Sequence, residues 1–228
     1  MVWSVPVVLR IEYIRWDMVN DRDRPSRTEK LQRLFELAAG QAGHFTAAQA
    51  RELGYSARSL VHHVNAGHVE RVSRGFYRLV GVPVGPHEDI VAAWLRLAPR
   101  GAVVSHDTAL ALYDLAPSRS REIHLTLPRE SRPRAPRTIS AVALHTTTAP
   151  LRRDEVTGRF GVQLTSPART LADVADIGAD PSVVLEATGR AVATGLVSPK
   201  ELRRAVKRRS ARVRQIVERA LEAVRLRA

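Results

Sequence analysis

The N-terminal part of the chain contains three short segments in which apolar residues recur at helical spacing. The segments follow Thr28, Thr46 and Ser56, residue types that commonly cap the first turn of a helix. Their apolar residues are Leu31, Leu34, Phe35 and Ala38 in the first segment, Ala47, Ala48, Ala50 and Leu53 in the second, and Leu60, Val61 and Val64 in the third. Three short helices with a tight turn at Gly54 between the last two are typical of a helix-turn-helix domain.

The next segment, residues 69–79, alternates between apolar and polar residues with a period of two. The alternation continues on both sides of Arg74 and Gly75, which predicts a β-hairpin that turns near Gly75. A hairpin directly after a helix-turn-helix is typical of a winged helix. We therefore expect a winged helix-turn-helix domain over residues 28–82 and a linker at residues 83–86, where proline and glycine interrupt the pattern.

From residue 85 onward the pattern predicts a mixture of helices and strands. Residues 102–104 are a short apolar segment, and alternation predicts strands at residues 122–128, 139–145 and 160–164. Helical spacing predicts helices at residues 87–97, 105–113 and 165–175, the last two capped by Ser105 and Ser166, and two or three helices close the chain. Residues 128–137 are expected to form a flexible basic loop. The predicted fold class is α+β: a winged helix-turn-helix domain followed by a mixed α/β domain over residues 85–228 with a helical C-terminus.

Residues 1–27 follow neither the helical nor the strand period. Residues 1–9 are apolar and residues 21–27 are mostly charged, so we expect a poorly ordered leader in which Met18 is a second plausible start. The N-terminus lacks the basic segment and the cleavage site of a signal peptide, and no apolar run approaches the roughly 20 residues that span a bilayer. The chain has no cysteine, which fits a reducing compartment. We expect a cytoplasmic protein that does not contact membranes.

The charge of the chain favours a polyanionic partner. It has 36 Lys and Arg residues against 23 Asp and Glu residues, a net charge of +13 at pH 7, and double-stranded DNA is the partner that fits a winged helix. On the polar face of the third predicted helix, which carries no carboxylate, the residues expected to contact bases or phosphates are Arg58, Ser59, His62 and His63. On the hairpin, the residues expected to grip the DNA backbone are Arg71, Arg74 and Arg78. The alternatives are a solvated basic face and a winged helix that binds protein.

A second concentration of positive charge lies at the C-terminus. Residues 200–228 contain eleven basic and three acidic residues. Their apolar residues form a stripe at helical spacing, which predicts an amphipathic helix packed against the core. The residues expected to contact an anionic partner are Arg203, Arg204, Lys207 and Arg208. The alternative is that they form a solvated face.

The chain contains no recognisable catalytic motif. Its eight histidines include no His-Glu-x-x-His pair, and without cysteine a metal site would need carboxylates that the pattern does not place. Phosphate-binding glycine loops and the Gly-x-Ser-x-Gly elbow are missing from the sequence. The acidic residue two positions before a lysine, which the common metal-dependent nuclease core needs, is missing as well. We therefore expect no catalytic residue, no metal, no cofactor and no enzymatic activity.

The sequence resembles the AbiEi family of antitoxins from type IV toxin–antitoxin systems, which includes mycobacterial members. Four segments carry the resemblance, in order and at matching spacing, and they are residues 71–79, 105–110, 121–128 and 164–173. Together with the winged helix they cover roughly residues 28–176. The C-terminal helices match only in character, and residues 1–27 do not match.

The resemblance implies two roles for the chain. The N-terminal domain would bind inverted repeats in the promoter of its own operon and repress transcription. The C-terminal domain would antagonise a cognate nucleotidyltransferase-like toxin, directly or indirectly. Two alternatives stay open: a DNA-acting, nuclease-like enzyme whose site is not recognised, and a transcription regulator that senses a small ligand.

Overall fold

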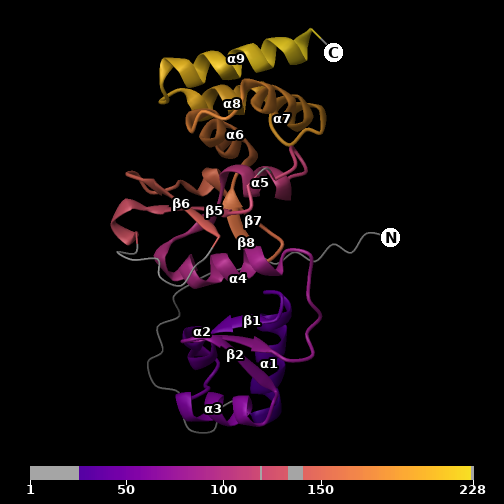
Figure 1. Cartoon of the computed structure of the whole chain (residues 1–228), viewed down its shortest axis with the longest axis vertical. Coiled ribbons are helices and arrows are strands. Elements are labelled where there is room, and N and C mark those ends of the chain that lie inside the picture. The colour runs from indigo at the N-terminus through magenta and orange to yellow at the C-terminus, as the bar shows by residue number, and fades with distance from the viewer. Residues whose placement is uncertain (1–25, 119, 133–140, 227–228) are drawn as a thin grey trace. The chain divides into compact units, whose positions relative to one another are not determined.

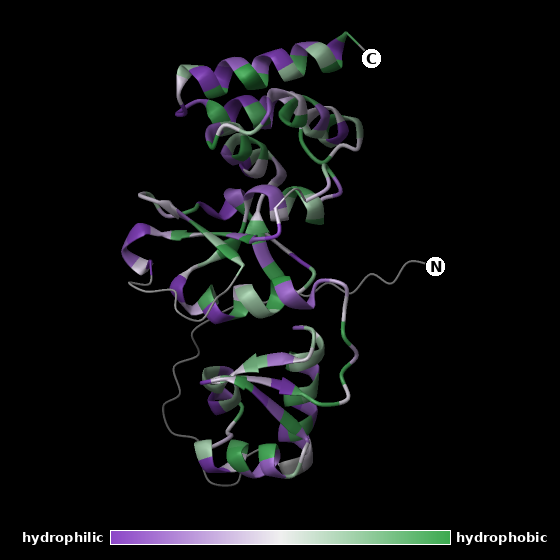
Figure 2. Cartoon of the chain, viewed as in Figure 1, coloured by the Kyte–Doolittle hydropathy of each residue, from purple (hydrophilic) through white to green (hydrophobic). Residues whose placement is uncertain are grey.

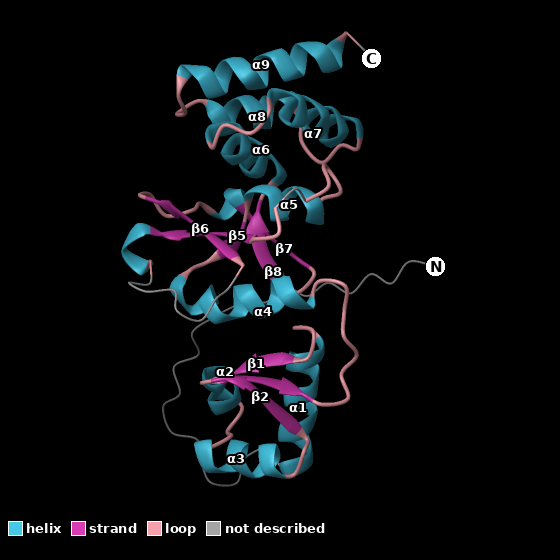
Figure 3. Cartoon of the chain, viewed as in Figure 1, coloured by secondary structure: helices cyan, strands magenta, loops and turns pink. Residues whose placement is uncertain are grey.

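The computed structural model describes residues 26–118, 120–132 and 141–226 (Figure 1). The predicted leader therefore lies outside the described residues except for its C-terminal end. The chain divides into two compact units: the first ends at Arg96 and also contains Phe160–Val162, and the second contains Leu97–Arg159 and the chain from Gln163 onward. The mixture of helices and strands confirms the predicted α+β fold class (Figure 3). Among the described residues, no helix is long and apolar enough to cross a membrane.

The first unit contains the three predicted helices, α1 (Arg27–Ala39), α2 (Ala47–Glu52) and α3 (Ala57–Asn65). Thr46 and Ser56 cap α2 and α3 as predicted, since each hydroxyl oxygen accepts a hydrogen bond from the backbone N–H three residues later. The prediction of Thr28 as the cap of α1 is wrong. The hydroxyl oxygen of Ser26 accepts the corresponding hydrogen bond, so α1 begins one residue before Thr28.

The core of the first unit uses a different face of α1 from the one predicted. Its buried residues are Leu34, Ala38, Phe45, Ala50, Tyr55, Leu60 and Val69. Leu37 packs against this core, whereas Leu31 and Phe35 are exposed. At 3.6 residues per turn, Leu31 and Phe35 lie about 60° and 100° around the helix from Leu34, on the side opposite Leu37. The buried face of α1 therefore runs through Leu34, Leu37 and Ala38.

The predicted hairpin is confirmed as β2 (Val69–Ser73) and β3 (Phe76–Leu79), which pair antiparallel. Gly75 in the turn has φ +73°, a conformation that costs glycine little because it has no Cβ. A further strand, β1 (His44–Thr46), pairs antiparallel with β3, and the sheet order is β1-β3-β2. We did not predict β1, because alternation cannot be recognised over three residues.

The first compact unit extends beyond residue 82, the expected end of the winged domain. Helix α4 (Glu88–Leu97) contacts the winged helix through side chains near both of its ends. Arg78 donates a hydrogen bond from Nε to Glu88 Oε1 at 3.1 Å, and the guanidinium of Arg96 lies 4.8 Å from the ring centroid of Phe76. The predicted linker at residues 83–86 contains neither helix nor strand. Because of these contacts, α4 up to Arg96 belongs with the winged helix.

A mixed sheet forms the centre of the second unit. Its strands are β4 (Val103–Val104), β5 (Ile123–Pro128), β6 (Val142–Thr147), β7 (Val156–Arg159) and β8 (Val162–Thr165), in the order β6-β5-β4-β8-β7. β5 pairs in parallel with β6 and antiparallel with β4, which pairs in parallel with β8. The strands predicted at residues 122–128, 139–145 and 160–164 thus correspond to β5, β6 and β8, although residues 139–140 lie outside the description. We did not predict β7, whose only apolar residue is Val156.

Helices complete the second unit. Those described are α5 (His106–Leu112), α6 (Pro167–Asp176), α7 (Pro181–Ala193), α8 (Pro199–Val206) and α9 (Ala211–Arg225). Short 3₁₀ turns occur at Ala98–Arg100, Arg129–Ser131 and Arg153–Glu155. The residues of the predicted flexible loop from 133 to 137 lie outside the described part of the chain.

Two predictions about these helices have different outcomes. Ser105 and Ser166 stand before α5 and α6 as predicted, but neither side chain makes a capping hydrogen bond. Ser105 Oγ instead contacts His106 and Thr126. The predicted amphipathic helix is confirmed as α9, along which hydrophobic and hydrophilic residues alternate (Figure 2). Its buried residues are Val213, Val217, Ala220 and Leu221.

Candidate nucleic-acid interface

Helix α3 presents a polar face that contains no carboxylate. Arg58 and His62 are exposed, and Ser59 and His63 are half-buried. Residues four apart share a helix face, so Arg58 lies beside His62 and Ser59 lies beside His63. This arrangement combines a charged donor with hydroxyl and imidazole groups, which is the set of groups that contacts base edges and phosphates in DNA complexes.

The inward face of α3 is narrower than predicted. Leu60 is buried and Val64 packs against the core, but Val61 is 57% exposed, so the prediction that Val61 turns inward is wrong. One residue advances a helix by about 100°, which places Val61 between the buried face and the face of Arg58 and His62. An exposed aliphatic side chain at this position can contact the methyl group of a thymine.

A polar hollow of about 400 Å³ lies between α3 and α1. Lys30 of α1 lines it together with Ser59, His62 and His63. The ring of Tyr55 meets that of His63 edge to face at 5.6 Å, which orients the imidazole. The sequence did not predict Lys30 as a residue that contacts DNA. Its proximity to α3 depends on tertiary packing, which the local sequence pattern does not reveal. It adds a positive charge beside the polar face.

The wing carries two exposed arginines. Arg71 lies on β2 opposite Tyr77 of β3, and Arg74 lies in the turn beside Gly75. Within the described ranges, neither guanidinium takes part in an ion pair. Two solvated arginines on a hairpin next to α3 are suited to contacts with phosphate oxygens.

Arg78, the third arginine of the hairpin expected to grip DNA, differs from these two in its surroundings. Its side chain is only 17% exposed. Nε donates to Glu88 Oε1 at 3.1 Å and Nη2 donates to the carbonyl oxygen of Val82 at 2.8 Å. Because the guanidinium bonds to Glu88 of α4 and to the carbonyl oxygen of Val82, Arg78 helps to hold this unit together.

The C-terminal basic residues also fall into two groups. Arg203 donates to both carboxylate oxygens of Glu218, and Nη2 of Arg204 lies 3.3 Å from Oδ2 of Asp154. Lys207 and Arg208 are exposed and have no ion-pair partner within the described part of the chain. Of the four residues expected to contact an anionic partner, Lys207 and Arg208 therefore carry the charge that no carboxylate of the described residues neutralises.

Comparison with known proteins places the winged helix in a family. Residues 32–80, from α1 through β3, match the model of the family described as "Transcriptional regulator, AbiEi antitoxin". The winged domain is of the AbiEi type. The expected resemblance is thus confirmed over this segment, and the family that it matches is described as an antitoxin and transcriptional regulator.

The fold of the chain is similar to that of a solved mycobacterial protein. The crystal structure of the RV2827C protein from Mycobacterium tuberculosis matches with a TM-score of 0.56 at 15% sequence identity, over 89% of this chain and 79% of that one. At this identity the match establishes similarity of fold only. No curated protein sequence matches this chain.

Proposed function

We propose that this AbiEi-type protein is the antitoxin and transcriptional autorepressor of a type IV toxin–antitoxin operon. The observation that carries the proposal is the carboxylate-free face of α3 beside the exposed Arg71 and Arg74, within a domain that matches antitoxin regulators. In this proposal α3 enters the major groove of inverted repeats in the operon's own promoter, and the wing contacts the backbone.

The proposal assigns separate tasks to the DNA-contacting residues. Arg58 and His62 read base edges, with Val61 between them, because they occupy the most exposed face of α3. Ser59, His63 and Lys30 contact the DNA phosphates that lie beside the hollow between α1 and α3. Arg71 and Arg74 contact phosphates without reading sequence.

The second unit supplies the antitoxin activity in this proposal. It antagonises a cognate nucleotidyltransferase-like toxin, directly or indirectly, with Lys207 and Arg208 as the exposed charges available to an acidic surface. Arg203 and Arg204 have lesser roles because carboxylates of the same unit already neutralise them.

Fluorescence anisotropy on promoter and scrambled duplexes at several salt concentrations tests the DNA-binding part. Arg58→Ala should weaken promoter binding by about 1–3 kcal/mol and flatten the preference at one base position. Arg74→Ala should weaken both duplexes equally and reduce the salt slope by about one unit.

Arg33→Ala serves as the control, because Arg33 is an exposed arginine of the same unit paired with Glu29 on α1. It should leave both affinities unchanged. If Arg58→Ala and Arg74→Ala reduce promoter and scrambled binding in the same proportion, the assignment of base reading to α3 is incorrect.

A further inference from the structure

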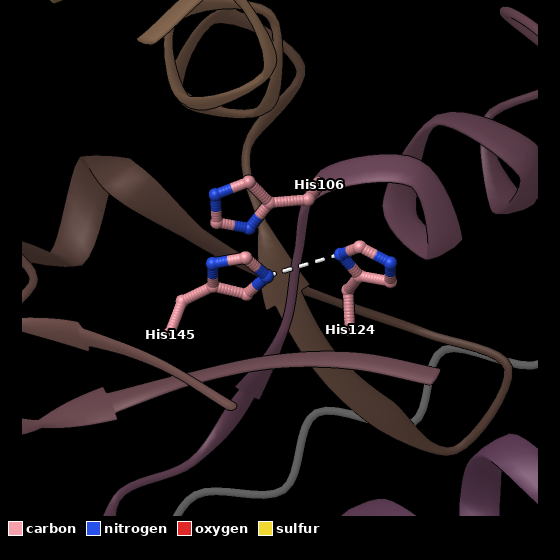
Figure 4. Close-up of side chains that lie close together, drawn as sticks. All are labelled: His106, His124 and His145. Carbon is pink, nitrogen blue, oxygen red and sulfur yellow. Dashed lines mark hydrogen bonds between the residues drawn. The ribbon is translucent and has the colours of Figure 1, made fainter. Parts of the chain in front are cut away.

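Three histidines from separate elements of the second unit meet at one point (Figure 4). His106 is the first residue of α5, His124 lies on β5 and His145 lies on β6. One ring nitrogen of each residue lies within 4.8 Å of the corresponding nitrogens of the other two. The sequence search for metal motifs did not detect this cluster, because the residues are far apart in the chain.

The pairing of β5 with β6 explains why the strands bring two of these histidines together. The strands are parallel, and His124 lies opposite Ala143 while Thr126 lies opposite His145. Side chains two residues apart along a strand share a face of the sheet. His145 therefore projects from the same face as His124, and the start of α5 places His106 over both.

The distances between the rings fit ligands of a single ion. Nδ1 of His124 lies 3.0 Å from Nε2 of His145, and the ring of His106 is stacked on that of His145 with 3.6 Å between centroids. A tetrahedral zinc ion with bonds of about 2.0–2.1 Å separates its nitrogen ligands by about 3.3 Å. Binding requires the first contact to open by a few tenths of an ångström and the His106 ring to tilt out of the stack.

Burial shields the histidine cluster from solvent. His106 and His124 are 5% and 8% exposed, so little water reaches their rings. Neutral imidazoles with free lone pairs are the metal-binding form.

The surroundings hold His106 in place. Its Nδ1 lies 2.9 Å from Ser105 Oγ, which accepts a hydrogen bond from Thr126 Oγ1 at 2.8 Å. This contact fixes the orientation of the His106 ring over the other two histidines. The backbone of His106 has φ +50°, a strained conformation for a residue with a Cβ, and such strain is concentrated at functional sites.

We propose that His106, His124 and His145 bind one transition-metal ion of the zinc class. Imidazole ligands suit Zn²⁺, Ni²⁺, Co²⁺ and Cu²⁺, whereas Mg²⁺ and Ca²⁺ require oxygen ligands. The fourth coordination position opens toward a polar pocket of about 320 Å³, which His106 and His145 line together with Arg169, Asp173 and Arg209. Both arginines pair with Asp173, so that carboxylate is already occupied and a water molecule takes the fourth position.

The experiment uses full-length protein without an affinity tag, stripped of metal with a chelator. Zn²⁺ is titrated by calorimetry, and Co²⁺ is titrated by its visible absorption, which distinguishes tetrahedral from octahedral coordination. We expect one equivalent of either ion to bind with a dissociation constant in the micromolar range or below. Because an ion that binds only the folded state stabilises it, the melting temperature should rise by about 5 °C or more at a hundredfold excess over the dissociation constant.

Two variants assign the ion to the cluster. His145→Gln, at a half-buried position where folding should survive, is expected to weaken binding at least tenfold, with circular dichroism confirming the fold. His68→Gln, an exposed histidine of the first unit, is the control and should bind as tightly as the wild type. Folded wild-type protein that fails to bind Zn²⁺ and Co²⁺ at micromolar concentration overturns the proposal, as does binding that His145→Gln leaves unchanged.

Discussion

At the scale of single residues, the functional assignments depend on what each charged side chain contacts. The arginines of the wing all look alike in the sequence, where they alternate with apolar residues. In the structure Arg71 and Arg74 are exposed, whereas Arg78 bonds to Glu88 and to a backbone carbonyl. The position of Arg78 on the hairpin could be predicted, but its partner could not, because Glu88 lies beyond the predicted domain boundary.

Arg78→Met should reduce stability and leave DNA contacts in place. It removes hydrogen bonds to a carboxylate and a carbonyl in a partly buried setting, which should lower the free energy of unfolding by about 1–2 kcal/mol. Arg74→Met, at an exposed position of the same hairpin, should leave stability unchanged. Urea unfolding measures the first effect, and the salt slope of DNA binding should fall only in Arg74→Met. A lower salt slope in folded Arg78→Met would contradict the assignment.

His44 makes the stability of the first unit sensitive to pH. It is 4% exposed, its ring stacks on Phe76, and burial lowers its pKa more than the nearby Glu88 carboxylate raises it. Below about pH 6.5 the unfolded chain therefore binds a proton that the folded protein does not bind. This proton lowers the free energy of the unfolded state relative to that of the folded state. The free energy of unfolding is therefore highest above this pH and decreases as the pH falls below it.

Replacement of His44 by phenylalanine tests this effect. The variant keeps the stacked ring and removes the titration, so its free energy of unfolding should fall less steeply between pH 7.5 and 5.5. The difference from the wild type is at most about 1.4 kcal/mol per pH unit for one group. Parallel curves for the two proteins in denaturant titrations would show that His44 does not titrate differently on folding.

At the scale of elements, the sequence predicted the segments with strong periodicity and missed those that depend on tertiary contacts. The helices α2 and α3 and the hairpin follow from local caps, periodicity and Gly75. The strand β1 was missed because it is too short to show alternation, and β7 because it carries one apolar residue. β7 pairs with β8, which follows it closely in the chain, whereas β1 is stabilised by pairing with β3, a strand distant in sequence. The histidine cluster could not be predicted for the same reason.

The cap of α3 links local structure to recognition. Ser56 Oγ accepts a hydrogen bond from the backbone N–H of Ser59 at 3.0 Å, in the turn that carries Arg58. Ser56→Ala should cost about 1 kcal/mol of stability and fray this turn. We therefore expect a loss of promoter affinity greater than the loss on scrambled DNA.

Ser198→Ala is the matched control. Ser198 caps α8 in the second unit in the same way, because its hydroxyl oxygen accepts a hydrogen bond from the backbone N–H of Glu201. It should cost a similar amount of stability and leave DNA binding intact. Thermal melting and anisotropy decide between the outcomes. Equal effects of both variants on promoter affinity would indicate a general loss of stability and no specific role for the cap.

At the scale of the whole molecule, the two units carry their exposed positive charge for different partners in our proposal. The first unit presents Arg58, Arg71 and Arg74 around α3, and the second presents Lys207 and Arg208 at the end of α8. If the proposal is correct, variants in one unit should affect one activity and spare the other. Operator binding and rescue of growth from a neighbouring toxin gene are the two activities to compare.

Arg58→Ala in the full chain should lose promoter binding and still rescue growth when the protein is expressed from an independent promoter. The double variant Lys207→Gln, Arg208→Gln should bind the promoter as the wild type does and rescue growth less well, because it removes two uncompensated charges from the second unit. This loss should be larger at low ionic strength if toxin and antitoxin form a complex in vitro, since salt screens exposed charges. The double variant Arg121→Gln, Arg129→Gln removes the same charge from exposed positions of the same unit and should rescue fully. If both double variants rescue equally well, Lys207 and Arg208 form only a solvated face; if folded Arg58→Ala fails to rescue, the two activities are not separate.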